Sequence, residues 1–410
     1  MDTYTEDRLS EAGRPRAAAG QPADACEVSV VMPCLNEAES LAPCVRAAQA
    51  AIAELGIAGE VIVADNGSTD GSVELAQSLG ARVAHVRARG YGSALQGGFA
   101  AARGKYILMG DADGSYDFGH LGRFLERLDA GAELVMGNRF GGGIASGAMP
   151  PLHRYFGNPG LSWIGRLFFR APVSDFYCGL RAFRRDVLPT LSLQSPGMEL
   201  GVEMVAKAAL HGLRVSEVPT TLSPDLRSRP PHLRTWRDGW RTLRFFLLYS
   251  PRWLFFYPGL ILILLGLGLS VAVLPGPLRV VGARLDVHTL LYAGAAIVVG
   301  FQGVVFSVLA RVYAGSEGFL PESSVVRQAR RSLSLELGLV VGGLLLLAGV
   351  ILSVITFVRW DQSSFHHLDY AATMRIAIPA AVALMLGVQT ILSSFFLSLL
   401  SIKHDPPAEG

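Results

Sequence analysis

Short apolar runs alternate with longer stretches of mixed polarity over the first quarter of the chain. The runs lie at residues 28–32, 60–64, 82–86 and 106–109, and each has the length and composition of a buried strand. The stretches between them have helical length. One follows Asn36-Glu-Ala-Glu39, which is typical of a helix cap with a returning glutamate, and another ends at Gly80. Repeated strand–helix units predict an α/β domain whose mostly parallel sheet carries helices on both faces.

The pattern changes after Pro251. Four largely apolar stretches lie near residues 253–274, 287–313, 335–358 and 374–402, each long enough to cross about 30 Å of hydrocarbon as a helix. A composition of 50% hydrophobic and only 17% charged residues agrees with a chain that is part soluble domain and part membrane domain. We therefore predict a disordered tail (1–24), the α/β domain (25–226), a basic amphipathic segment (227–251), an all-α transmembrane domain (252–403) and a short tail (404–410).

The distribution of charge predicts the orientation in the membrane. Arginines gather before the first apolar stretch and in the second connection, namely Arg227, Arg229, Arg234, Arg237, Arg241 and Arg244, and Arg327, Arg330 and Arg331. Because positive loops stay inside, we expect a multi-pass protein of the cell membrane with its α/β domain in the cytoplasm. Arg279 and Arg284 in the first connection weaken this prediction without reversing it. The four cysteines form no Cys-x-x-Cys pair, which fits a reducing compartment.

Residues 233–249 have the pattern of an amphipathic helix. Trp236, Trp240, Leu243 and Leu247 recur at spacings of three or four, and arginines follow beside them. Such a helix can lie in the membrane surface with its aromatic side chains in lipid and its guanidinium groups among the headgroups. The alternative is a helix packed on the α/β domain with solvated arginines.

Polar motifs follow the predicted strands. Asp111 and Asp113 come directly after the strand at 106–109, with glycines on both sides. Two carboxylates in this place can bind Mg²⁺ or Mn²⁺ and leave coordination positions open for substrate phosphates, although Asp-x-Asp alone is also compatible with a surface turn. Ligands of parallel sheets bind at the carboxyl ends of the strands. The motifs near residues 33–37, 65–70 and 89–92 lie at such ends, which strengthens the prediction of one site.

Four of these motifs, in order and spacing, resemble family 2 glycosyltransferases with the GT-A fold. They are Pro33-Cys-Leu-Asn-Glu37, Asp65-Asn-Gly-Ser-Thr-Asp70, Gly90-Tyr-Gly92 and Asp111-Ala-Asp113. Residues 175–183, 199–211 and 215–219 look like the polyprenyl-phosphate sugar synthases, which include the dolichyl-phosphate mannose and glucose synthases. The resemblance implies a nucleotide-sugar site formed by Pro33, Leu35, Asn36, Glu37, Asp65, Asn66, Gly67, Ser68, Arg89, Gly90, Gly92, Asp111, Ala112 and Asp113.

The same resemblance implies a metal held by Asp111, Asp113 and Ser115. Where the family often has a longer polar side chain, this chain has Ser115, so water or Asp117 is an alternative ligand. The catalytic residues implied are Asp113, Arg139, Arg154 and Asp175. Arg139 and Arg154 occur where the family places arginines of the cleft, with a surface position as the alternative, and Asp175 is expected to orient an arginine or the acceptor, or to cap a helix.

The implied reaction is transfer of a hexose from a nucleotide diphosphate sugar to polyprenyl phosphate, with UDP-glucose slightly favoured over GDP-mannose. A lipid phosphate is already an anionic nucleophile at neutral pH, so no general base is required, and a single displacement inverts the anomeric carbon. Arginine suits the acceptor phosphate through its planar fork. Besides both substrates, the lipid bilayer is an expected partner and nucleic acid is not; the oligomeric state is left open.

Two other functions compete with this interpretation. A processive polysaccharide synthase would require a Gln-x-x-Arg-Trp motif, whereas Ser250-Pro-Arg-Trp253 lacks the glutamine. A lipid-carrier transporter or scaffold with an inactive transferase domain is the non-enzymatic alternative. The intact pair of aspartates argues against that second alternative.

Overall fold

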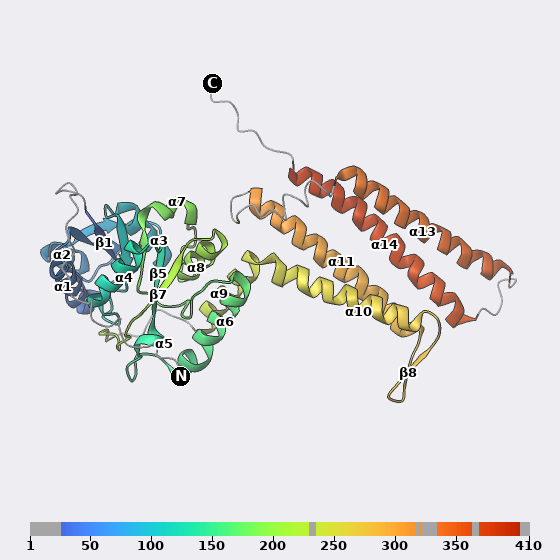
Figure 1. The fold of residues 1–410 in the computed structure, drawn as a ribbon, viewed down its shortest axis with the longest axis horizontal. Helices are drawn as coiled ribbons and strands as arrows, with labels where there is room; N and C mark the ends of the chain where they lie inside the picture. The colour runs from blue at the N-terminus through green and yellow to red at the C-terminus, as the bar shows by residue number, and fades with distance from the viewer. Residues whose placement is uncertain (1–25, 229–234, 317–319, 321–333, 363–368, 402–410) are drawn as a thin grey trace, which may run out of the picture. The chain divides into compact units, whose positions relative to one another are not determined.

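The computed structural model describes residues 26–228, 235–316, 320, 334–362 and 369–401 (Figure 1). The chain forms two compact units. The first comprises Met1–Pro159, Val173–Gly201 and Leu213–His232, and the second comprises Gly160–Pro172, Val202–Gly212 and Leu233–Gly410. Short segments from the middle of the chain therefore group with the C-terminal helices. The predicted tails at 1–24 and 404–410 lie outside the described residues.

A seven-stranded sheet forms the centre of the first unit. Its spatial order is β3-β2-β1-β4-β6-β5-β7. The strands are β1 (Val28–Cys34), β2 (Gly59–Asp65), β3 (Arg82–His85), β4 (Tyr106–Met109), β5 (Leu134–Asn138), β6 (Arg181–Arg184) and β7 (Val215–Pro219). Only β6 runs antiparallel to its neighbours β4 and β5, while the other pairs are parallel. The mostly parallel sheet predicted from the alternating pattern is confirmed.

Helices cover both faces of this sheet. The longer ones are α1 (Ala38–Glu54), α2 (Ser72–Ser78), α3 (Tyr91–Ala101) and α4 (Leu121–Asp129). Successive side chains of a strand point to opposite faces. Accordingly, Val30 and Met32 of β1 belong to the hydrophobic cluster that includes α1 and α4. Val31 lies on the other face, where Gly98 of α3 packs so closely that an added Cβ would come within 2.4 Å of it.

Among its described residues, the second unit has helices and one hairpin. It contains most of α6 (Asn158–Phe169) and α8 (Leu200–Leu210), then α9 (Thr235–Tyr249), α10 (Tyr257–Val273), α11 (Val287–Ser316), α13 (Leu335–Gln362) and α14 (Tyr370–Ser401). Four helices are long and apolar enough to cross a membrane, namely Arg252–Val273, Val287–Ser316, Leu335–Asp361 and Tyr370–Leu400. This agrees with the predicted spans.

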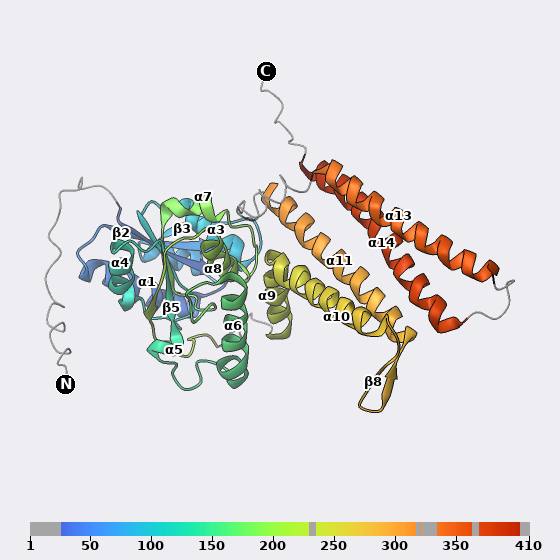
Figure 2. The same cartoon turned by 45° about the vertical axis from the view of Figure 1, so that its right-hand side comes forward.

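These four long helices pack in series, α10 on α11, α11 on α14 and α14 on α13 (Figure 2). Small residues allow the backbones to approach one another. An added Cβ at Gly259 of α10 would lie 2.6 Å from the carbonyl oxygen of Gly300 in α11, and one at Gly266 would lie 2.6 Å from that of Ala293. Close contact through small residues is the usual way in which apolar helices associate in a membrane.

Helix α9 has two different apolar surfaces. Phe245 and Phe246 are buried, and the Phe246 ring packs 5.5 Å from that of Phe169 in α6. Trp236 and Trp240 are instead 84% and 61% exposed. The two indole rings of the predicted face are therefore uncovered among the described residues, whereas Leu243 and Leu247 of the same face are half-buried.

Candidate active site

Three neighbouring strands bring the predicted motifs to one edge of the sheet. In the order β2-β1-β4 the strands are parallel, so their carboxyl ends meet. Asp65 is the last residue of β2, Glu37 follows β1, and Asp111 and Asp113 follow β4. Side chains that lie far apart in the sequence therefore surround one space at this edge.

The Asp65 carboxylate organises the loop after β2. It accepts hydrogen bonds from the backbone N–H groups of Ser68 (3.0 Å) and Gly67 (3.2 Å). Burial alone would raise the pKa of Asp65, but the hydrogen bonds from Ser68 and Gly67 outweigh burial and keep that pKa below its ordinary value. The loop is also joined to the one after β1, because the Asn36 N–H donates to the Ser68 hydroxyl at 2.9 Å.

The beginning of α1 differs from the predicted capping box. Glu37 occupies the N-cap position, yet its side chain makes no capping hydrogen bond. The Ala38 N–H instead donates to the carboxylate of Asp70 at 3.0 Å, and Glu39 accepts two hydrogen bonds from Ser228. Glu37 and Glu39 therefore do not cap α1. The carboxylate of Asp70, in the loop after β2, provides the cap.

A pocket of about 300 Å³ lies beside Asp65 and is lined by Asp65, Asn66, Gly67, His85, Val86, Arg87 and Arg89. The amide of Asn66 supports its wall by donating to the carbonyl groups of Val86 (3.1 Å) and Ala88 (2.7 Å). Its oxygen accepts from the Gly90 N–H at 2.8 Å. Asn66 therefore fixes the segment that carries Arg89.

Gly90 and Gly92 are explained by packing within the chain. A Cβ at Gly90 would lie 2.2 Å from the carbonyl oxygen of Pro196, and Gly90 has a φ of +129°. A Cβ at Gly92 would lie 2.3 Å from the carbonyl oxygen of Ser195. The sequence motif does not reveal this partner, since residues 195–197 come about a hundred positions later.

Asp111 is enclosed by two residues that the sequence analysis missed. The Tyr91 hydroxyl donates to its carboxylate at 2.8 Å, and a Cβ at Gly179 would lie only 2.7 Å from the other oxygen. Burial, with the charge of Asp113 as a further cause, raises the pKa of Asp111 to about 6. Next to it, the carbonyl oxygen of Ala112 is held by the Ser40 hydroxyl at 2.7 Å.

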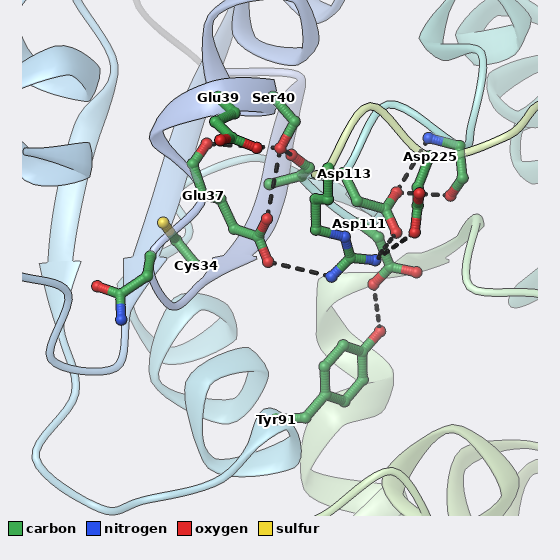
Figure 3. Close-up of polar contacts among 12 residues, drawn as sticks. Cys34, Glu37, Glu39, Ser40, Tyr91, Asp111, Asp113 and Asp225 are labelled. Carbon is green, nitrogen blue, oxygen red and sulfur yellow. Dashed lines mark hydrogen bonds and ion pairs between the residues drawn. The ribbon is translucent and has the colours of Figure 1, made fainter. Parts of the chain in front are cut away.

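Asp113 is bound by Ser115 and by an arginine from the end of the domain. Ser115 donates its N–H and its hydroxyl to one carboxylate oxygen at 2.9 and 2.6 Å. Arg227 donates to the other oxygen and also reaches Glu37 at 3.2 Å. Figure 3 shows the carboxylates of Glu37, Asp111 and Asp113 close together. The Arg227 Nε is buried without a hydrogen-bond partner among the described residues. Sequence analysis counted Arg227 with the arginines of the membrane-proximal segment, and its place is instead in this site.

Residues 222–228, which we call the strap, deliver Arg227 to the site. The Leu226 N–H donates to the Asp113 carbonyl and the Ser223 N–H to the Ser115 carbonyl, both at 2.9 Å. At its end, the Ser228 hydroxyl lies 2.8 Å from the Glu39 carboxylate. Backbone pairing with the loop after β4 thus places the strap residues without any local sequence signal.

The donor atoms fit a hard divalent cation that shares its coordination with a substrate. Asp111 and Asp113 offer carboxylate oxygens, which Mg²⁺ and Mn²⁺ prefer. Among the described residues no group of three or more His, Cys, Asp or Glu side chains is arranged as a complete metal site. In this structure the Asp113 carboxylate is paired with the Arg227 guanidinium.

Arg139 and Asp175 form a buried, two-pronged ion pair. The Asp175 oxygens accept from Nε of Arg139 at 2.7 Å and from Nη2 at 2.8 Å, and Arg139 and Asp175 are 6% and 0% exposed. Asp175 thus orients an arginine, one of the roles expected for it. Burial, together with the nearby charge of Arg139, lowers the pKa of His153. The next residue, Arg154, lies 5.7 Å from the ring of Tyr155.

The comparisons with known proteins define a class of enzyme. Residues 29–191 match the model of glycosyl transferase family 2, and residues 308–401 match that of the glycosyltransferase family 2 C-terminal transmembrane region. The low-salt glycan biosynthesis hexosyltransferase Agl6 of Haloferax volcanii is 37% identical over 374 residues, 91% of this chain and 89% of that protein. The chain belongs to glycosyltransferase family 2 and is a membrane protein, as predicted.

Two further matches cover smaller parts of the chain. A dolichyl-phosphate hexose transferase of Haloferax volcanii is 31% identical over 39% of this chain and 68% of its own length. Glucosyl-3-phosphoglycerate synthase of Mycobacterium tuberculosis, solved with Mn²⁺, UDP and glucosyl-3-phosphoglycerate, has 22% identity and a TM-score of 0.42, over 54% of this chain and 78% of that one.

Proposed function

We propose that this glycosyltransferase moves a hexose from a nucleotide diphosphate sugar to polyprenyl phosphate, with inversion at the anomeric carbon. The observation that carries the proposal is the gathering of Glu37, Asp65, Asp111 and Asp113 at one sheet edge of a domain that continues into four membrane-spanning helices. The names of the hexosyltransferase and dolichyl-phosphate relatives support a hexose donor and a lipid-phosphate acceptor.

The nucleoside of the donor would occupy the pocket beside Asp65. The Asp65 carboxylate would face the ribose. On the neighbouring loop, Pro33, Leu35 and Asn36 would contact the base. Arg89 lines the same pocket and supplies a positive charge toward the phosphates. We infer UDP-glucose slightly ahead of GDP-mannose. This preference rests on the resemblance of residues 111–118, together with residues 229–234 outside the described part of the chain, to bacterial proteins likened to dolichyl-phosphate glucose synthase.

The diphosphate would lie against Asp111, Asp113 and Arg227. A Mg²⁺ or Mn²⁺ ion held by the two aspartates would neutralise the departing diphosphate. Arg227 must then leave the Asp113 oxygen that it binds in this structure. Its guanidinium would then offer a second positive charge to the leaving phosphates, while Ser115 would keep Asp113 oriented.

The acceptor phosphate is assigned to the side of the site that holds Arg139. Asp175 fixes the plane of this guanidinium, which limits the entropy lost when a phosphate binds. Arg154, in the segment His153–Gly157, is a second candidate for this phosphate. Since the lipid phosphate is already anionic, the residues need only bring it in line with the anomeric carbon.

We place the catalytic domain in the cytoplasm and the four helices in the cell membrane, on the distribution of arginines described above. In this orientation α9 lies at the cytoplasmic membrane surface, with Trp236 and Trp240 facing the lipid. The nucleotide sugar and the phosphate of the carrier lipid would then be accessible from the same compartment.

Incubation of membranes that contain the protein with a panel of labelled nucleotide sugars tests the proposal. Extraction into organic solvent should recover labelled lipid with one hexose per phosphate, released by mild acid. A labelled polymer would instead favour a processive synthase. Absence of any labelled lipid with every donor, in membranes where the folded protein is present, would contradict the proposed function.

A further inference from the structure

A two-stranded hairpin joins the far end of α10 to the beginning of α11 (Figure 2). Its strands are β8 (Leu278–Val280) and β9 (Ala283–Leu285), paired antiparallel with Arg279 directly opposite Arg284. Side chains of opposed residues lie on the same face of a hairpin. One face therefore carries two guanidinium groups, and the other carries Leu278 and Val280, both exposed.

The tip of the hairpin is apolar. Val281 and Gly282 form the two-residue turn with φ values of +46° and +82°, the positive values that tight hairpin turns of type I′ require. Asparagine and glycine are the usual residues there, and a β-branched residue with positive φ is rare. The Val281 side chain is fully exposed. Together with Leu278 and Val280, it forms an uncovered apolar end next to the charged face.

Carboxylates near the hairpin are too few to balance its arginines. Asp286 pairs with Arg375 of α14 at 2.5 Å and with Arg284 at 3.3 Å. Arg279 forms no ion pair within the part of the chain that the structure describes. Arg284 and Arg375 thus share one carboxylate, while Arg279 lies opposite Arg284, and like charges directly opposite each other on a sheet repel. An anion between Arg279 and Arg284 would relieve this repulsion.

The base of the hairpin is fixed on the membrane helices. Leu285 packs on a buried cluster formed by Val273 of α10, Leu290 of α11 and Ile378 of α14. Arg375 also donates to the Val273 carbonyl at 3.5 Å. The arginine face is therefore held at the end of the apolar helices, which is the level of the lipid headgroups in a membrane.

We propose that this hairpin is a binding site for the phosphate group of an anionic phospholipid, on the membrane face opposite the catalytic domain. One crossing by α10 separates the hairpin from the catalytic domain, so the two lie on different sides. Leu278, Val280 and Val281 enter the apolar layer, and Arg279 and Arg284 bind the phosphate through their planar forks. The contact sets the depth of the α10–α11 pair in the bilayer.

The test uses the full-length protein with Arg279→Gln and Arg284→Gln combined. Native mass spectrometry of the detergent-solubilised protein, titrated with phosphatidylglycerol, gives an apparent lipid affinity. We expect this affinity to fall roughly tenfold or more, since each arginine near an anionic surface contributes about fivefold. The matched control is Arg123→Gln with Arg127→Gln, which removes the same charge from exposed positions of α4 and should leave the affinity unchanged.

A spin label at Val281→Cys gives a second readout in vesicles. In phosphatidylglycerol vesicles the label should be accessible to oxygen and protected from an aqueous nickel reagent, and the double glutamine change should remove this protection. A label equally exposed to the aqueous reagent in both proteins would overturn the proposal. So would an equal loss of lipid affinity in the α4 control, or displacement of the lipid by millimolar inorganic phosphate, which would identify a site for soluble phosphate.

Discussion

Arg227 places its guanidinium against the Asp113 carboxylate, although 114 positions separate the two residues in the sequence. The same side chain reaches Glu37 at 3.2 Å and Asp225 at 3.5 Å. On the proposed function, a metal ion bound at Asp113 would compete with the guanidinium of Arg227 for this carboxylate. Binding of the donor with its metal would then be coupled to a movement of Arg227.

Removal of this guanidinium should strengthen the binding of metal and weaken the binding of nucleotide sugar. In Arg227→Ala we expect Mn²⁺ alone to bind roughly tenfold more tightly, because a competing charged contact of about 1.5 kcal/mol is gone. The KM for nucleotide sugar should rise, because the phosphates lose a positive partner. Calorimetry and steady-state kinetics measure the two effects. Arg227→Lys keeps the charge, so its Mn²⁺ affinity and its KM should lie between those of the wild type and Arg227→Ala. Unchanged Mn²⁺ affinity in Arg227→Ala would contradict the competition between metal and guanidinium.

The aspartate itself should be indispensable. Asp113→Ala is expected to abolish transfer while the protein still folds, because the diphosphate loses the cation that the two carboxylates hold. Asp111→Ala should be somewhat milder if Asp111 acts partly through the nucleoside. Glu126→Ala is the control, since this exposed carboxylate of α4 has no place in the site. Lipid-linked hexose is measured with and without EDTA, and activity of Asp113→Ala that survives EDTA would rule out the metal assignment.

The sheet edge was predictable from the sequence because each motif follows a short apolar run. Parallel strands bring such ends together whatever the distance between them along the chain, so Asp65, Asp111 and Asp113 could be grouped without a structure. The cap of α1 could not be found in this way. Asp70 from another loop provides it, and no local pattern distinguishes a capping carboxylate from one in the site.

The residues that the sequence analysis missed are those whose role depends on a distant partner. Tyr91 lies between the two glycines of a motif whose predicted role rests on those glycines. Its hydroxyl nevertheless contacts Asp111. Arg227 looked like one of several arginines before a membrane helix. Its separate role comes from the pairing of residues 222–228 with the loop after β4, a contact that has no sequence period of its own.

Gly179 should be sensitive to the smallest enlargement. An alanine there would place its Cβ 2.7 Å from Asp111 and 2.9 Å from the ring of Tyr116, so the carboxylate must shift. We expect Gly179→Ala to weaken Mn²⁺ binding and to lower kcat severalfold, with thermal unfolding little changed. Gly160→Ala is the control, because a Cβ there meets no atom within 4 Å. Normal Mn²⁺ affinity in Gly179→Ala would mean that Asp111 is not a ligand.

The role of the buried Arg139–Asp175 pair is best tested with conservative substitutions. Loss of either partner leaves an unpaired buried charge, which costs about 3–5 kcal/mol of stability, so alanine would confuse folding with binding. Arg139→Lys keeps the charge and loses the fork. We expect the KM for lipid phosphate to rise roughly tenfold to a hundredfold, the value of a charge-assisted contact, with little change in donor KM. A change in donor KM alone would move Arg139 to the other side of the site.

The exposed surface of α9 bears on how the acceptor meets the site. Trp236 and Trp240 are exposed, while the opposite side of the helix, with Phe245 and Phe246, is buried. Arg237, Arg241 and Arg244 are exposed as well, and each arginine near an anionic leaflet contributes about 1 kcal/mol. Four apolar helices already hold the protein in the membrane, so anchoring is not needed from α9. We therefore expect α9 to set the height and tilt of the catalytic domain over the lipid.

The double change Arg237→Glu, Arg241→Glu separates this role from that of a helix with merely solvated arginines. If α9 positions the domain, transfer to a long-chain acceptor in anionic liposomes should fall steeply, because the reversed charges repel the surface. Transfer to a short, detergent-soluble acceptor needs no such positioning and should stay near normal. The same reversal at Arg123 and Arg127, on the exposed side of α4, controls for net charge and should alter neither reaction. Equal losses with both acceptors would show damage to folding or chemistry and end the positioning hypothesis.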